Sequence, residues 1–127
     1  MNFTSYLKLG LAAAAMAATP AALAHGSLKP RHGGIVTMSG ETVVELVRAP
    51  QGVSVYVTEE DEPLPATSMT AKLVVTAGGA KSERPLVAGP DNRFDARGLK
   101  IPAGAKVAVM LVNKATQART VASFTVK

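Results

Sequence analysis

The sequence contains no cysteine and no tryptophan, and only two histidines, His25 and His32. Without cysteine the chain has no disulfide staples, no thiolate metal ligands and no cysteine-linked lipid anchor. Because both histidines stand near the N-terminus, the sequence shows no recognisable serine–histidine–acid motif, and no glycine-rich phosphate loop follows a strand. The sequence therefore predicts a protein that is not an enzyme.

Aromatic residues and clustered charge are also scarce. Aromatic residues make up 4% of the chain, and its formal net charge of +5 comes from lysines and arginines that are scattered singly. Surfaces that bind nucleic acid usually cluster basic residues and interleave them with aromatic side chains. We therefore expect a solvated basic surface and no nucleic-acid partner.

The N-terminal residues have the composition of an export signal. Lys8 precedes the apolar run Leu9–Ala18, and the small-residue site Ala-Leu-Ala follows at positions 22–24. The run is shorter than the roughly 20 residues that a membrane-spanning helix needs, so we expect cleavage after residue 24. Residues 1–24 are thus predicted to be a signal peptide and residues 25–127 a single periplasmic domain with no stable membrane span after cleavage.

Beyond Gly34 the chain alternates between short runs rich in β-branched residues and turn-forming residues. This spacing predicts an all-β fold, a two-layer antiparallel β-sandwich of immunoglobulin-like or cupredoxin-like topology. Strict alternation places Val53, Val55 and Val57 on one face of a strand. The expected strands are 35–38, 41–48, 53–58, 70–77, 81–87, 93–96, 106–112 and 117–126.

Two further expectations concern side chains in these segments. Met110 lies in the strongly apolar segment 106–112, so we expect it in the core. The acidic run 59–62 is followed by two prolines, which disfavour an inner strand, so we expect an exposed loop there.

The two histidines suggest a metal site. If His25 is the mature N-terminus, its amine and imidazole can chelate one ion, and the imidazole of His32 can add a third nitrogen. Nitrogen ligands favour Cu(II), and thioethers such as that of Met38 select Cu(I). Carboxylates of the run 59–62, or Asp91 and Asp95, are candidate oxygen ligands. The alternative is a metal-free terminus in which His32 is a turn residue bonded to the backbone.

Three segments in order resemble a known group of proteins. They are His32-Gly33-Gly34-Ile35-Val36, Val44-Glu45-Leu46-Val47, and Val55-Tyr56-Val57-Thr58 with acidic residues and a proline behind. Together they resemble small periplasmic HGG-type domains associated with the membrane-fusion subunits of copper, silver and cobalt–zinc–cadmium efflux systems. The resemblance covers residues 30–65 and matches His32.

A more distant similarity, to small periplasmic copper-binding β-sandwich proteins that begin with histidine after export, matches His25. The two resemblances imply metal handling or heavy-metal resistance, with a component of a heavy-metal efflux complex as partner.

The sequence therefore predicts an exported, non-catalytic protein that binds a transition metal, with a copper ion favoured and His25, His32 and Met38 as ligands. The runner-up is a metal-free interaction module accessory to an envelope complex. An oxygenase of the copper type would share an N-terminal histidine, but the chain is short and poor in the aromatic residues that grip a polymer. The oligomeric state stays open.

Overall fold

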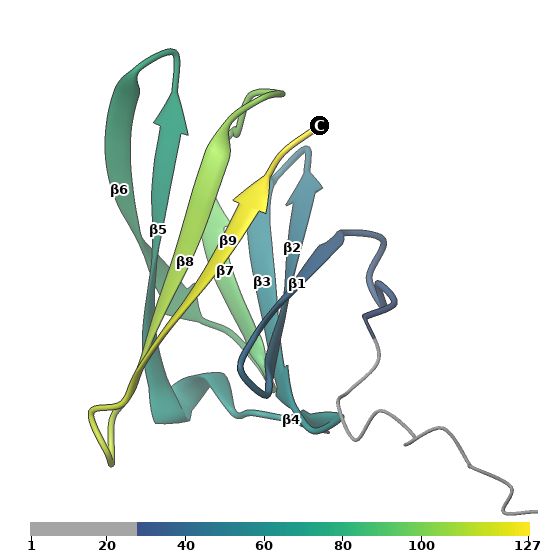
Figure 1. Ribbon diagram of the computed structural model, residues 1–127, viewed down its shortest axis with the longest axis vertical. Helices are drawn as coiled ribbons and strands as arrows, with labels where there is room; N and C mark the ends of the chain where they lie inside the picture. Colours follow the sequence, from purple (N-terminus) through teal and green to yellow (C-terminus); the bar gives the residue numbers. More distant parts are fainter. Residues whose placement is uncertain (1–27) are drawn as a thin grey trace, which may run out of the picture.

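The computed structural model describes residues 28–127, and in this part every long element is a β-strand (Figure 1). A single 3₁₀ turn, η1, covers Ala66–Ser68. The predicted signal segment and His25 lie outside the described residues. The strands are β1 (Ile35–Ser39), β2 (Thr42–Ala49), β3 (Gly52–Glu59), β4 (Glu62–Pro63), β5 (Met69–Ala77), β6 (Ala80–Ala88), β7 (Arg93–Arg97), β8 (Lys106–Asn113) and β9 (Arg119–Thr125).

All paired strands are antiparallel, and the hydrogen-bonded order is β1-β2-β3-β7-β6-β5-β8-β9, with β4 attached to β3. Strand β6 joins the two halves of this order, because it pairs with β5 along most of its length and with β7 only at Val87 and Ala88. The β2–β3 half comprises β1, β2, β3, β4 and β7, and the β5–β8 half comprises β5, β6, β8 and β9.

The two end strands of the order lie side by side (Figure 1). The hydroxyl of Thr37 on β1 donates a hydrogen bond to the carbonyl of Ser123 on β9, at 3.1 Å. The sheet is thus curled until its ends nearly meet. The all-β prediction is confirmed. The shape of the curled sheet is intermediate between the predicted two-layer sandwich and a closed barrel.

Alternating side chains from both halves fill one core. Val53, Val55 and Val57 of β3 are all buried, as the alternation predicts, and Phe94 of β7 is the largest fully buried side chain. Burying a valine, leucine or phenylalanine side chain contributes roughly 1.5–3 kcal/mol each. The buried members from β8 and β9 are Val107, Val109, Leu111, Ala122 and Phe124.

The prediction that Met110 is a core residue is wrong. The alternation that buries Val109 and Leu111 turns Met110 to the outer face, where it is half-buried. The acidic run is exposed apart from the half-buried Glu59, and it also forms a tight turn. There Glu60 and Asp61 adopt positive φ angles, and the two-residue strand β4 returns to pair with β3.

No helix among residues 28–127 is long and apolar enough to cross a membrane.

Candidate functional site

The segment that precedes β1 lies over the outer face of the β2–β3 half. Val36, Glu45 and Tyr56 form one cross-strand row on this face, since Val36 pairs with Glu45 and Glu45 pairs with Tyr56. Outward-facing residues of an antiparallel sheet usually contact water. Glu45 is nevertheless only 5% exposed, and it is the one buried charged residue in the described part of the chain.

Glu45 is buried because its carboxylate holds the chain at residues 31–34. Its Oε1 accepts a hydrogen bond from the backbone N–H of Arg31 at 3.0 Å and lies 2.9 Å from the ring Nδ1 of His32. Its Oε2 accepts hydrogen bonds from the backbone N–H groups of His32 at 2.8 Å and Gly34 at 3.0 Å. One side chain thus satisfies four donors of a segment that has no strand partner of its own.

These hydrogen bonds determine the charge state of Glu45. Burial by itself would raise its pKa, because desolvation disfavours the charged carboxylate. The hydrogen bonds from the His32 ring and from the backbone of Gly34, His32 and Arg31 act in the opposite direction. Together they outweigh burial and lower the pKa of Glu45 below its ordinary value of 4.5. Glu45 is therefore an anion at neutral pH.

The imidazole of His32 is held on two sides. Its ring stacks on the ring of Tyr56, with centroids 3.5 Å apart and planes 6° from parallel. Because an ionised carboxylate only accepts hydrogen bonds, the Nδ1 that faces Glu45 carries the proton. In the neutral ring the lone pair is then on Nε2, and the side chain remains 40% exposed.

The structure explains the presence of glycine at the two positions after His32 in two different ways. Gly33 has a φ of +74°, in the left-handed region that glycine adopts without strain. Gly34 lies so close to β2 that a Cβ at this position would collide with the backbone carbonyl of Leu46. The first glycine turns the chain, and the second lets it approach the sheet.

A shallow hollow of about 250 Å³ lies beside the His32 ring. Its lining includes Glu45 and Tyr56, and also the cationic residues Lys29 and Arg31. The guanidinium of Arg31 pairs with the carboxylate of Asp61 at 3.2 Å, and both side chains are more than half exposed. Because cationic side chains also line the hollow, a cation bound here would be held mainly by nitrogen ligands and not by attraction to the surrounding charge.

The structure brings only one of the predicted metal ligands into this site. His32 lines the hollow, whereas Met38 does not. Met38 lies two residues further along the outer face of β1, opposite Val43, and is half-buried. His25 lies outside the described residues.

The candidate oxygen ligands are dispersed. Asp61 is next to Arg31, whereas Asp95 accepts hydrogen bonds from Ser54 at 2.7 Å and from Arg93 at 3.1 Å. The nearby carboxylate of Asp95 raises the pKa of Arg93, so the guanidinium stays charged. Across residues 28–127 no three His, Cys, Asp or Glu side chains are grouped so that they could hold a metal ion.

Sequence reasoning missed the roles of Glu45 and Tyr56. Glu45 looks like an ordinary solvent-facing residue of an alternating strand, and its burial depends on a segment 11 to 14 residues earlier in the chain. A signal was nevertheless present. The three segments that carry the family resemblance contain His32, Glu45 and Tyr56, which are the residues that meet at this site.

Comparison with models of known families, with curated proteins and with solved structures finds no match to this chain.

Proposed function

We propose that this protein binds a transition-metal ion, with copper favoured, and that His32 supplies one ligand through its Nε2. The observation that carries the proposal is the 2.9 Å hydrogen bond between the His32 Nδ1 and Glu45. Histidines that bind metals in proteins almost always donate their other ring N–H to a carboxylate or carbonyl. That partner selects the tautomer, orients the ring and makes the free nitrogen a better ligand.

The stack on Tyr56 supports the same role. A ring held between a carboxylate and an aromatic face loses little further freedom when its second nitrogen, Nε2, binds a ligand. The hollow beside the ring provides access for an ion.

The remaining ligands in this proposal come from His25. With cleavage after residue 24, His25 contributes a free amine and a second imidazole. The intervening chain spans up to roughly 24 Å when extended, so its length allows the amine to reach His32. Three nitrogen ligands in this arrangement favour Cu(II). Met38 is the candidate thioether ligand for Cu(I).

The proposed setting is the periplasm, where the protein handles metal beside a heavy-metal efflux complex without catalysing a reaction. Support for this setting comes from the signal-like residues 1–24 and from the family resemblance.

A Cu(II) titration tests the proposal on protein exported by a bacterial host, with its N-terminus established by mass. We expect one ion per chain. One extra residue before His25 should weaken binding by about 100-fold, because the chelating amine is lost, and His32→Gln should weaken it by about 10-fold. Met110→Leu, which alters a thioether outside the hollow beside His32, is the matched control and should leave copper affinity unchanged. Met38→Leu should leave Cu(II) affinity unchanged and weaken Cu(I) binding.

A different mature N-terminus, or binding that tolerates both the extra residue and His32→Gln, would overturn the proposal. In that case Glu45 would be a structural anchor for the N-terminal segment and His32 a turn residue.

A further inference from the structure

A second surface of interest lies on the outer face of the β5–β8 half. On β8, Val107, Val109 and Leu111 point into the core, so Met110 and Val112 point outward. The outward residues of a one-sided antiparallel sheet are usually polar. On β8 the outward residues Met110 and Val112 are instead apolar.

Strand register arranges these residues in two cross-strand rows. The first row runs Pro85, Lys72, Met110, Val121 across β6, β5, β8 and β9. The second runs Thr70, Val112, Arg119 across β5, β8 and β9. Together the two rows line a groove of about 340 Å³.

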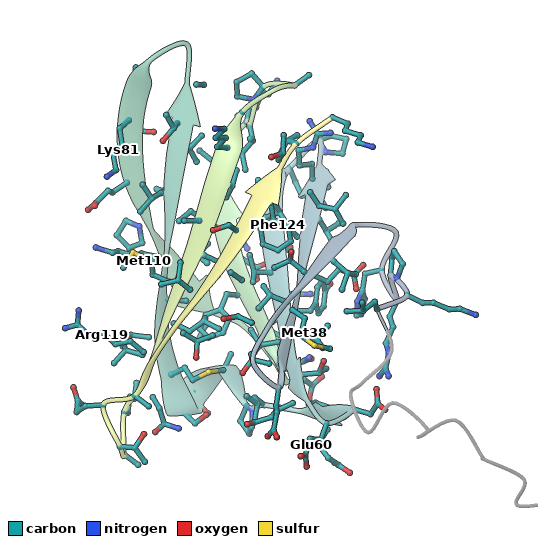
Figure 2. The ribbon with its side chains drawn as sticks, viewed as in Figure 1. Met38, Glu60, Lys81, Met110, Arg119 and Phe124 are labelled. Atoms are coloured by element: carbon teal, nitrogen blue, oxygen red, sulfur yellow. The ribbon has the colours of Figure 1, made fainter. Side chains whose placement is uncertain are left out.

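The groove faces solvent in the described part of the chain. Val121 is 47% exposed, and no element among residues 28–127 packs over the two rows. Figure 2 shows Met110 and Arg119 on the side of the molecule away from the N-terminal segment and Met38. Met110 and Val112 are half-buried beside Val121, and apolar side chains that face solvent within a polar rim are the kind of surface that partner proteins contact.

Two cationic side chains line the groove, and they lie apart from each other. Lys72 lies in the first row on β5, and Arg119 lies at the end of the second row on β9. Strand spacing and rise place their Cα atoms about 12 Å apart, on opposite sides of the apolar floor. None of the residues that line the groove is acidic. Lys72 is within 3.6 Å of Glu83, an exposed pair that a stronger partner can exchange at little cost.

The separation of the two cations favours some classes of ligand over others. A small amphiphile with one anionic headgroup can pair with only one of the two cations. An extended peptide places residues i, i+2 and i+4 on one face, and residues i and i+4 are about 13 Å apart. Two carboxylates at those positions would match Lys72 and Arg119, with an apolar side chain between them over Met110.

We infer that this groove binds an extended acidic segment of a partner protein, in which an apolar residue is flanked by carboxylates on the same face. The affinity comes from apolar contact with Met110, Val112 and Val121, and the orientation comes from Lys72 and Arg119. This inference rests on the groove alone and does not depend on metal binding.

The test uses the full chain with ¹³C-methyl-labelled methionine and a capped peptide, Glu-Ser-Leu-Ser-Glu, as the probe. The methyl signal of Met110 should shift saturably, with a Kd of roughly 0.1–1 mM. The signals of Met69, which is buried, and of Met38, which lies in the other half, should not move. The peptide Lys-Ser-Leu-Ser-Lys and the single-headed amphiphile octanoate should leave Met110 unchanged.

A charge reversal locates the contact. Arg119→Glu should weaken binding of the acidic peptide by about fivefold or more. The matched control is Lys106→Glu, an exposed cation on β8 that does not line the groove, and it should change binding by less than about twofold.

Three results would overturn the inference. They are no shift of Met110 with the acidic peptide, equal shifts with the lysine peptide or octanoate, and a shift of Met110 on dilution of the protein alone. The last result would assign the groove to self-association.

Discussion

Glu45 accepts hydrogen bonds from both the backbone and the ring of His32, at 2.8 and 2.9 Å. This double contact couples the path of the N-terminal segment to the orientation of one imidazole. A single buried carboxylate on β2 therefore has two consequences, one for stability and one for the chemistry available at His32.

Removal of the Glu45 carboxylate should release the segment at residues 31–34. Glu45→Ala leaves three backbone N–H groups and the His32 ring without their acceptor. We expect the free energy of unfolding in urea to fall by about 2 kcal/mol. Glu41→Ala, which alters an exposed carboxylate next to the same strand, is the control and should cost less than about 0.5 kcal/mol. Equal losses from the two variants would contradict the anchoring role.

The contribution of Glu45 should depend on pH in a defined direction. Because its pKa is lower in the folded protein than its ordinary value of 4.5, the unfolded chain binds the proton more readily. The stabilisation is fully present above about pH 4.5 and is lost as the pH falls through the folded-state pKa. The stability difference between wild type and Glu45→Gln, followed by urea unfolding from neutral to acidic pH, should therefore shrink below pH 4.5. A difference that grows on acidification would contradict this sign.

Substitution of Gly33 and substitution of Gly34 by alanine should have different structural effects. Gly34→Ala drives a methyl group against the Leu46 carbonyl and should cost about 2–3 kcal/mol, with loss of the His32–Tyr56 stack. Gly33→Ala meets no neighbouring atom within 4 Å and only strains a left-handed residue, at about 1 kcal/mol. Urea unfolding together with the His32 ring resonances separates the two effects. A stack that survives Gly34→Ala would show that close approach to β2 is not required.

The stack itself should be visible by NMR. At 3.5 Å the Tyr56 ring current shifts the His32 ring protons upfield, and Tyr56→Leu should return them to ordinary values. We expect this variant to lose about 1 kcal/mol of stability. Tyr56→Phe retains an aromatic face and serves as the control, in which the upfield shift persists. Identical spectra for the Leu variant and wild type would rule out the stack.

The side chain of Arg31 should contribute little to the free energy of unfolding, whereas its backbone N–H should contribute more. The guanidinium makes an exposed ion pair with Asp61, whereas the backbone N–H contacts Glu45. Arg31→Ala should change the free energy of unfolding by less than about 0.5 kcal/mol. Arg31→Pro removes the N–H donor and should cost more. If urea unfolding reverses this order, the backbone contact is not the important one.

Much of the fold follows from local pattern. Alternation in segments such as 53–58 predicts both strands and buried faces, because a strand with one solvated face repeats every two residues. Met110 shows where this reasoning fails. An apolar run suggests burial on both sides, but no strand within residues 28–127 covers the outer side of β8.

The candidate site was only partly predictable. His32 stands out because the chain has two histidines, whereas the role of Glu45 depends on how a loop folds over a sheet. No local periodicity encodes that contact. The prediction of His25 as a ligand concerns a residue outside the described part of the chain.

The most direct test of the account is the tautomer of His32 in metal-free protein, read from long-range ¹H–¹⁵N correlations of the ring at about pH 8, where ordinary imidazoles are neutral. The account predicts a proton on Nδ1, which donates to Glu45, and a lone pair on Nε2. In Glu45→Gln the preference for this tautomer should weaken. A proton on Nε2 in the wild-type protein would contradict the account, since Glu45 would then not hold the ring and Nε2 would not be free to bind a metal.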